Sequence, residues 1–168
     1  MNTDLVTILR QNHALEHATI SLLIKKLDAN VRIIGKSTFD GFYIYGNVPS
    51  KAVREAATDS LVRLKGGERE LAVSPHCGTN IVIAGIMAGV ACFIALGGKN
   101  RGQRLPLAIM MATGAILASQ PVGKTAQKYI TTSSSLSDVV IKRITRRGSG
   151  SRTLYKIETA RELAIPAD

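Results

Sequence analysis

The sequence has 168 residues, which is enough for one domain with a modest core and too little for a multidomain enzyme. Lys and Arg number 22 against 12 Asp and Glu, so the formal charge is +10, yet 45% of the residues are hydrophobic. Nucleic-acid binders with this charge are normally hydrophilic, and disordered basic tails lack apolar residues. The composition therefore argues against both classes and indicates that the apolar residues are concentrated in particular segments.

The N-terminal part, residues 1–78, is expected to form a small α/β portion. Apolar side chains recur at helical spacing after Thr3, a suitable N-cap, and the segments that follow have the composition of strands. Gly66 and Gly67 are placed to end a second helix. The patterns predict five elements in this order: a helix over residues 3–28, strands over 31–37 and 41–48, a helix over 50–65 and a short strand over 70–74.

Residues 79–123 are expected to form a transmembrane helical hairpin. The stretches 79–96 and 105–122 contain no charged residue, and each approaches the roughly 20 residues that cross a bilayer core. The connection between them is too short for anything but a tight reversal, so the two helices are antiparallel. A buried hairpin in a soluble bundle is the alternative, although so small a core does not need two helices that are apolar on every face. Gly85 and Gly89 form a small-residue surface that lets membrane helices approach closely.

The charges that flank the two spans predict that both termini are cytoplasmic. The loop between the spans is basic, but the opposite flanks carry more Lys and Arg. Charged residues interrupt the first thirty positions, so no cleavable signal peptide is visible. Cys77 and Cys92 do not form a disulfide framework, because Cys92 is expected in mid-membrane, and this fits a reducing compartment. We therefore expect a two-span protein of a cytoplasmic membrane.

The C-terminal part, residues 124–168, is expected to contain a polar linker and a basic β-hairpin that complete the cytoplasmic portion. Strands are predicted over 138–147 and 152–159. The fold class that follows is an α+β membrane protein, with the transmembrane helical hairpin inserted in a small α/β portion that begins with a long amphipathic helix. Basic residues of this β-hairpin are expected to contact anionic lipid headgroups, and no nucleic acid. These residues are Lys142, Arg143, Arg146, Arg147 and Arg152.

The chemistry is expected on the first helix, where residues 13–17 read HALEH. At 100° per residue, the side chains of His13, Glu16 and His17 fall within an arc of about 100°. Two imidazoles can then hold one Zn²⁺ while the carboxylate serves as the general base toward a water molecule on the metal. Glu16 also lies in the apolar stripe, where a buried carboxylate needs a metal or a strong donor beside it.

A third ligand is expected from the segment that precedes the first span. His76 is the third and last histidine of the sequence, and it would complete a His₃ site; Cys77 is the alternative and would give His₂Cys. Either set leaves the fourth position open for water, as in catalytic zinc sites. A carboxylate ligand is a further alternative, with these candidates: Glu55, Asp59, Glu68 and Glu70.

The HALEH segment resembles the signature of the inverzincin zinc metallopeptidases, which has this reversed order of the zinc motif. The resemblance implies that His13 and His17 are ligands and that Glu16 is the base. This sequence differs from that family, because it has no identified glutamate ligand downstream of the motif. As a whole, the segments HALEHATI and HCGTN with the two following spans resemble an uncharacterised bacterial family of two-span membrane proteins, which places the chain in a bacterial inner membrane.

Two functions from different classes remain open. The first is a membrane-anchored zinc-dependent hydrolase, a metallopeptidase that uses the HxxEH site at the cytoplasmic membrane face. The second is a non-catalytic accessory subunit of a larger membrane complex or a homo-oligomer, in which the histidines are structural or ligate a pigment or haem. In the structural case His13 and His17 are packed residues, and Glu16 is hydrogen-bonded to Arg10 or to a backbone donor.

Overall fold

The computed structural model describes residues 4–27, 31–98, 100–148 and 153–162. The expectations for Thr3, for residue 28 as the end of the first helix and for Arg152 concern positions outside these ranges. The chain divides into two compact units. One unit, called the α/β unit below, combines Met1–Ser74 with Ile130–Asp168, and the other, called the helical hairpin, is Pro75–Tyr129.

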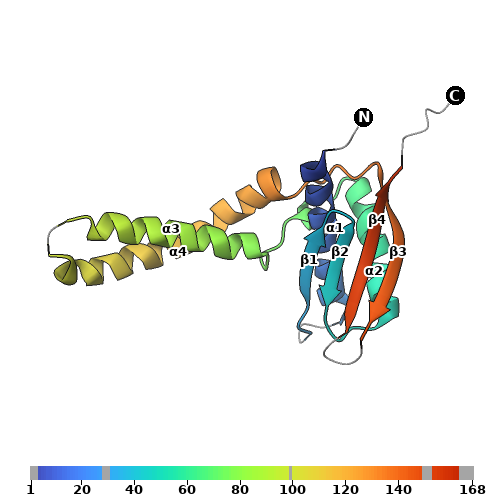
Figure 1. Ribbon diagram of the computed structural model, residues 1–168, viewed down its shortest axis with the longest axis horizontal. Coiled ribbons are helices and arrows are strands. Elements are labelled where there is room, and N and C mark those ends of the chain that lie inside the picture. Colours follow the sequence, from blue (N-terminus) through green and yellow to red (C-terminus); the bar gives the residue numbers. More distant parts are fainter. Residues whose placement is uncertain (1–3, 28–30, 99, 149–152, 163–168) are drawn as a thin grey trace. The chain divides into compact units, whose positions relative to one another are not determined.

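The α/β unit contains a sheet whose strands come from both ends of the sequence. The described residues form four antiparallel strands in the order β1-β2-β4-β3, with α1 and α2 packed on one face of the sheet (Figure 1). The elements are α1 Leu5–Leu27, β1 Ile34–Thr38, β2 Gly41–Tyr45, α2 Ser50–Lys65, β3 Val139–Arg147 and β4 Leu154–Arg161. Strand β4 lies between β2 and β3, so the segment that follows the helical hairpin completes the sheet.

The core of this unit lies between the sheet and its two helices. Period-2 alternation places Phe42 and Ile44 of β2 against the helices together with Tyr155 and Ile157 of β4, and all four are buried. They meet the buried stripes of α1 and α2, which include Leu15, Leu23, Val53 and Leu64. Burial of these side chains fixes α1 firmly on the sheet, so the residues on its flanks have defined positions.

The expected strand segments differ from the structure at several of their ends, and β4 extends to Arg161, past the expected residue 159. Strand β1 begins at Ile34 rather than at residue 31, and β2 ends at Tyr45 rather than at residue 48. The pairing of β1 with β2 runs only from Ile34–Tyr45 to Thr38–Gly41, and Gly46, the residue after β2, donates its N–H to the Thr153 carbonyl. The strand expected over 70–74 is instead a 3₁₀ helix, η1, over Arg69–Ala72, whose Glu, Leu and Ala residues favour helical backbone.

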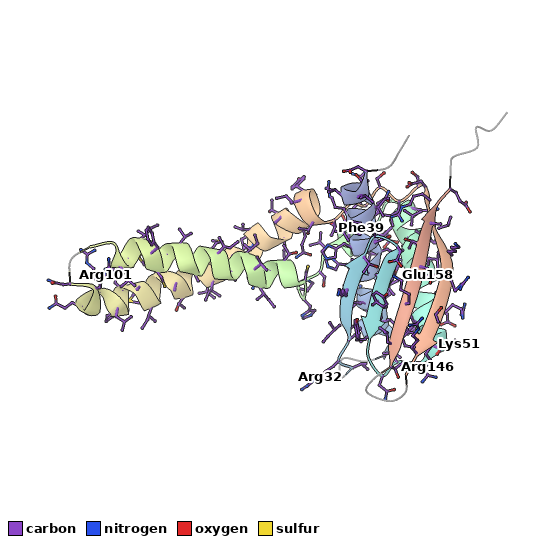
Figure 2. All side chains as sticks on the ribbon, in the orientation of Figure 1. Arg32, Phe39, Lys51, Arg101, Arg146 and Glu158 are labelled. Atoms are coloured by element: carbon purple, nitrogen blue, oxygen red, sulfur yellow. The ribbon has the colours of Figure 1, made fainter. Side chains whose placement is uncertain are left out.

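The helical hairpin consists of α3 Gly78–Leu96 and α4 Leu105–Ala126, joined through the 3₁₀ helix η2 Arg101–Arg104. Arg101 lies at the turn end of the hairpin (Figure 2). Within the described residues, these two helices are long and apolar enough to cross a membrane. Their large apolar side chains are mostly exposed, with Phe93 at 81% and Leu117 at 72%. A chain of this kind is α+β, with four α-helices and a four-stranded antiparallel sheet among the described residues.

The two helices of the hairpin are joined by polar contacts near the ends that connect to the α/β unit. The Asn80 amide donates to the Pro75 carbonyl (2.9 Å), and its Oδ1 accepts from the buried Gln127 amide (2.8 Å). Gly123 makes room for Asn80, because a Cβ at Gly123 would lie 2.3 Å from Asn80 Oδ1. Gly85 and Gly89 do not mark the helix contact, since a Cβ at either meets no atom of the described residues within 4 Å. Helix α4 also continues through Pro121 and passes into a π-helical turn, η3 Gln127–Thr131.

Candidate metal centre

The two histidines of the HALEH segment lie on adjacent turns of α1 and face each other. Their ring centroids are 4.3 Å apart, and their ligand nitrogens lie within 4.8 Å of each other. His17 is buried and His13 is half-buried. Two nitrogens bound to one tetrahedral zinc are about 3.5 Å apart, so small side-chain adjustments bring the pair to coordinating distance.

Each imidazole is held from behind by a backbone carbonyl. His13 Nδ1 lies 2.9 Å from the Thr131 oxygen, and His17 Nδ1 lies 2.8 Å from the Ala72 oxygen. A carbonyl oxygen only accepts hydrogen bonds, so Nδ1 of each ring carries the proton, and the lone pair of the neutral ring is then on Nε2. Metal-binding histidines typically have this arrangement, because the second hydrogen bond fixes the tautomer and makes the ligand nitrogen more basic.

The same two carbonyls lie where the chain leaves and re-enters the α/β unit. Ala72 is in the last segment before the chain leaves at Ser74, and Thr131 is in the first segment after it returns at Ile130. Arg10 reinforces the returning segment, because its guanidinium donates to the Thr132 carbonyl and its own carbonyl accepts from the N–H of Ser133. The histidine pair therefore marks the junction between the α/β unit and the hairpin segment of the sequence.

His13, His17 and Cys77 together form a group that could hold a metal ion. In the sequence, Cys77 follows Ala72, the carbonyl partner of His17, by five residues. Cys77 is buried, and its sulfur accepts from the N–H of Thr79 at the start of α3. His76, the first choice for the third ligand from the sequence, is exposed and is not in this group.

Glu16 is buried on the side of α1 that faces β1. It accepts a hydrogen bond from Ser37 Oγ, and its carboxylate lies over Gly35, where a Cβ would overlap it. Arg10, one donor expected for Glu16 if the histidines were structural, donates to the Thr132 carbonyl. Ser37 and Gly35 are both on β1, two residues apart and therefore on the same face of the strand. The local spacing of HALEH gave no sign of these two residues, because they approach Glu16 only when the strand packs on the helix.

The acidic residues considered as alternative ligands lie on the surface. Glu55 pairs with Lys26, and Asp59 and Glu68 both pair with Arg63. The hydrogen bond from Lys26 lowers the pKa of the Glu55 carboxyl, as that from Arg63 does for Glu68. Glu70, in η1, is exposed.

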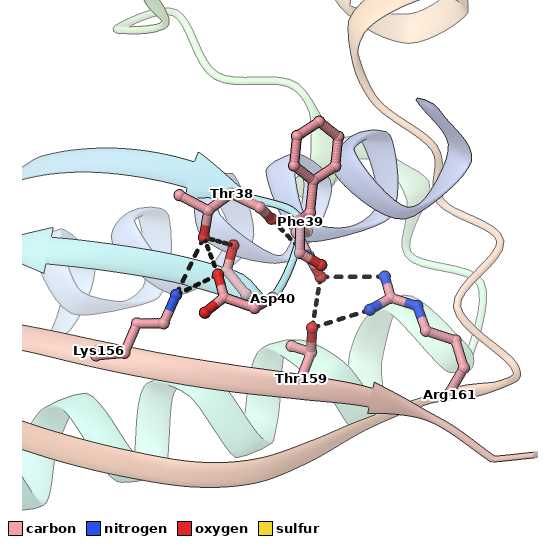
Figure 3. A network of polar contacts seen from close by, with 8 residues as sticks. Thr38, Phe39, Asp40, Lys156, Thr159 and Arg161 are labelled. Carbon is pink, nitrogen blue, oxygen red and sulfur yellow. Dashed lines mark hydrogen bonds and ion pairs between the residues drawn. The ribbon is translucent and has the colours of Figure 1, made fainter. Parts of the chain in front are cut away.

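A polar network next to the site ties β4 to α1 (Figure 3). Arg161 donates to Asn12 Oδ1 (3.1 Å) and to the Ile8 carbonyl (3.1 Å), and Thr159 also donates to Asn12 Oδ1 (2.8 Å). Burial lowers the pKa of the Arg161 guanidinium, and the nearby Asp138 carboxylate acts in the opposite direction. Because Asn12 is adjacent to His13, this network holds the helix backbone at the histidines against the centre of the sheet.

The fold and the site define an α+β protein with a paired-histidine group that could hold a metal, joined to a helical hairpin of membrane-spanning length. The family model described as "Domain of unknown function (DUF6391)" matches residues 8–144, and the chain belongs to this family. An uncharacterized protein of Picosynechococcus sp. strain PCC 7002 is 33% identical over 137 residues, which cover 74% of this chain. The matched region spans 65% of that relative's length. No solved structure matches.

Proposed function

We propose that this protein is a membrane-anchored zinc-dependent hydrolase, with metallopeptidase chemistry at the cytoplasmic face of a bacterial inner membrane. The observation that carries the proposal is the pair of imidazoles whose Nδ1 atoms are both committed to backbone carbonyls. Two neutral histidines at i and i+4, with a thiol as third ligand, form the N/S donor set that zinc prefers over magnesium or calcium. The fourth position is then available to water.

Glu16 is the residue we assign as general base. Zinc lowers the pKa of a coordinated water molecule to about 7, so a nearby carboxylate can accept its proton. The hydrogen bond from Ser37 holds Glu16 Oε2 on the β1 side. Glu16 would have to leave this hydrogen bond and turn toward the histidines to act on a metal-bound water, so Ser37 would hold the resting position of the carboxylate.

The exposed apolar surface of α3 and α4 supports the membrane part of the proposal. Hydrophobic side chains of this size on both helices would remain in water if the protein were soluble and monomeric, and patches of that extent are unfavourable there. Both helices also satisfy their backbone hydrogen bonds internally, as a bilayer requires. The bilayer is the simplest environment that buries this surface.

The metal site is tested by measuring metal in detergent-purified protein by inductively coupled plasma mass spectrometry. The informative variants are His13→Asn and His17→Asn, because the Asn amide can still donate to the Thr131 or Ala72 carbonyl while the Nε2 ligand is lost. We expect about one zinc per chain in the wild type and a loss of at least about tenfold in affinity in either variant. Cys77→Ser should also lose zinc, whereas His76→Ala is the matched control and should retain it. Zinc-free wild type, or equal zinc in all variants, would contradict the site.

Catalysis is tested separately with Glu16→Gln. This variant keeps the size of the side chain and removes the base, so we expect retained zinc and a loss of peptide hydrolysis of about 100-fold or more. The assay uses wild type, Glu16→Gln and His76→Ala reconstituted in vesicles with a library of unstructured peptides. Zinc binding without hydrolysis in the wild type would leave a structural metal site and remove the enzyme assignment.

A non-catalytic accessory subunit is the second candidate, and one observation favours it. Both histidines hold the segments at which the chain leaves and re-enters the α/β unit, which is a structural task that needs no metal. In that case the wild type should co-purify with one large membrane partner in a fixed ratio after mild detergent extraction. His13→Asn and His17→Asn should then preserve the complex, because both keep the hydrogen bonds to the carbonyls.

A further inference from the structure

The sheet of the α/β unit has one face that the two helices of this unit leave uncovered. Helices α1 and α2 pack on the side of Phe42, Ile44, Tyr155 and Ile157 (Figure 1). Among the described residues of this unit, no helix packs on the opposite side. That side is called the open face below. Its residues alternate with the core residues along each strand, so the strand pairing determines which side chains it carries.

A basic and aromatic row crosses the middle of the open face. Tyr43 of β2 is paired with Lys36 of β1 on one side and with Lys156 of β4 on the other, and directly paired residues share a face. The Lys156 ammonium lies 4.2 Å from the centroid of the Tyr43 ring. Tyr45, two residues along the same strand, has its ring centroid 6.3 Å from that of Tyr43. The open face therefore carries two neighbouring aromatic rings on one of its central strands.

The adjacent row contains the most accessible of these rings. Tyr45 is paired with Ile34 of β1 and with Leu154 of β4, and Leu154 is paired in turn with Arg147 of β3. Tyr45 is 41% exposed and Ile34 is 68% exposed. Lys156 already occupies a position over the Tyr43 ring, so Tyr45 is the ring that a ligand reaches most easily.

The open face has an excess of positive charge. Two acidic side chains on or beside it are already matched in ion pairs (Figure 3 shows the first), which are Asp40 with Lys156 and Glu158 with Arg143. Lys36 and Arg147 form no ion pair within the described residues. These two cations lie on the edge strands β1 and β3, and therefore flank the aromatic rings on both sides.

We propose that the open face binds single-stranded RNA. Bases can stack on the tyrosine rings while the flanking cations bind phosphates, which is how proteins bind single strands without reading their sequence. In the sequence the aromatic and the basic residues belong to separate hairpins, which is why no nucleic acid is expected there; the pairing of β2 with β4 joins them on one surface. Lipid headgroups or an acidic peptide would use the same cations but leave the exposed ring unused. RNA is chosen over DNA because single strands on a cytoplasmic side are chiefly RNA, and this choice alone rests on the location proposed above.

The test is a titration of fluorescein-labelled oligouridine with the full chain in a neutral detergent, followed by fluorescence anisotropy. Tyr45→Leu keeps an apolar side chain and removes the ring, and Tyr45→Phe keeps the ring. Tyr129→Leu is the matched control, because Tyr129 is exposed and belongs to the helical hairpin. Lys36→Gln and Arg147→Gln each remove one flanking cation. Their control is Arg54→Gln, since Arg54 is exposed on α2, which packs on the other side of the sheet.

We expect Tyr45→Leu to raise the Kd for oligouridine about fivefold or more, because one stacking contact is lost. Tyr45→Phe and Tyr129→Leu should bind as the wild type does, which separates loss of the ring from a general folding defect. Lys36→Gln and Arg147→Gln should each reduce the slope of log affinity against log salt by about 0.7, and Arg54→Gln should leave it unchanged.

Two further probes distinguish RNA from other polyanions. Inorganic polyphosphate has no bases, and the bases of an RNA duplex are already stacked on each other, so both should bind more weakly than oligouridine. Polyphosphate binding as tight as oligouridine binding, with Tyr45→Leu unchanged, would overturn the inference and leave a charged surface suited to anionic headgroups. Wild type that does not bind oligouridine would also overturn it. Because binding is measured in detergent, neither result depends on the membrane location of the protein.

Discussion

His13 and His17 each use one ring nitrogen for the fold and present the other for a ligand. The carbonyls of Thr131 and Ala72 accept from Nδ1, so that Nε2 is the ring nitrogen left to bind a metal. A shift of either carbonyl would therefore reduce metal affinity without removing any ligand. Ser37 and Gly35 likewise affect the site through the position that they give to the Glu16 carboxylate.

The ion pair between Asp40 and Lys156 gives a pH-dependent prediction. The hydrogen bonds from Lys156, and then from Thr38, lower the pKa of the Asp40 carboxyl in the folded protein. A lowered folded pKa means that the pair stabilises the fold above the ordinary carboxyl pKa of about 3.9 and that this contribution is lost as pH falls through the folded value. Asp40 is 71% exposed and Lys156 only 10%, so solvent screening limits the effect.

We expect Asp40→Asn to lower the free energy of unfolding by at most about 1 kcal/mol at pH 7 and by much less near pH 3. Urea unfolding in detergent, followed by circular dichroism at both pH values, measures the difference. Glu55→Gln is the matched control, because Lys26 and Glu55 are both half exposed and their pair should contribute less. An Asp40→Asn effect that grows as pH falls would show the opposite sign of linkage.

At the scale of elements, the contact between α3 and α4 depends on Gly123. A Cβ there would lie 2.3 Å from Asn80 Oδ1 and 3.4 Å from Asn80 Cα, so the amide would have to move and its hydrogen bond from Gln127 would break. We expect Gly123→Ala to destabilise the hairpin by about 1–3 kcal/mol. Unfolding by SDS in mixed micelles measures this change. Gly114→Ala is the control, because a Cβ at Gly114 meets no atom of the described residues within 4 Å, and equal effects of both variants would contradict the predicted contact.

Elements with strong local signals were predictable from the sequence. Helix α2 spans Ser50–Lys65 as expected, because Pro49 precedes it and Gly66 ends it. The apolar stretches likewise gave α3 and most of α4. The segment expected as a strand from residue 70 became η1, because four to five residues of Glu, Leu and Ala are too short for their period to separate strand from helix.

The candidate site was predictable only in part. The spacing of His13 and His17 on a helix was enough to bring the two rings together. The choice between His76 and Cys77 depends on burial, which adjacent residues do not reveal in a sequence. The carbonyl partners and Ser37 come from segments 21 to 118 residues away from their partners, so no local pattern could contain them.

At the scale of the whole molecule, the α/β unit needs chain from both sides of the hairpin. Strand β4 covers β2 and contributes Tyr155 and Ile157 to the core, and the Tyr155 hydroxyl donates to the buried Val48 carbonyl. A chain that stops after residue 137 lacks these contacts. One edge of β2, the strand of Phe42 and Ile44, is then unpaired.

We expect that truncated chain to be cleaved rapidly within residues 5–65 by a soluble protease, whereas the full chain resists. Vesicle-reconstituted protein and gel electrophoresis of the fragments provide the comparison. The hairpin should stay protected in both chains if it lies in the bilayer, so it serves as an internal control. A truncated chain as resistant as the full one would show that β3 and β4 are dispensable for the core.

The hydrogen bonds that Asn80 makes with Pro75 and Gln127 affect the order in which the chain folds. Synthesis delivers α1, β1, β2 and α2 first, then the hairpin, and β4 last, so the sheet closes late and across a long stretch of chain; Thr159 and Asn12, for example, are 147 residues apart. Once α3 and α4 pair, the hydrogen bonds of Asn80 hold the two ends of the hairpin together. The loop between the first and last strands of the sheet is then effectively short. Because the entropy of loop closure grows with loop length, pairing of α3 with α4 lowers the entropic barrier to completing the sheet.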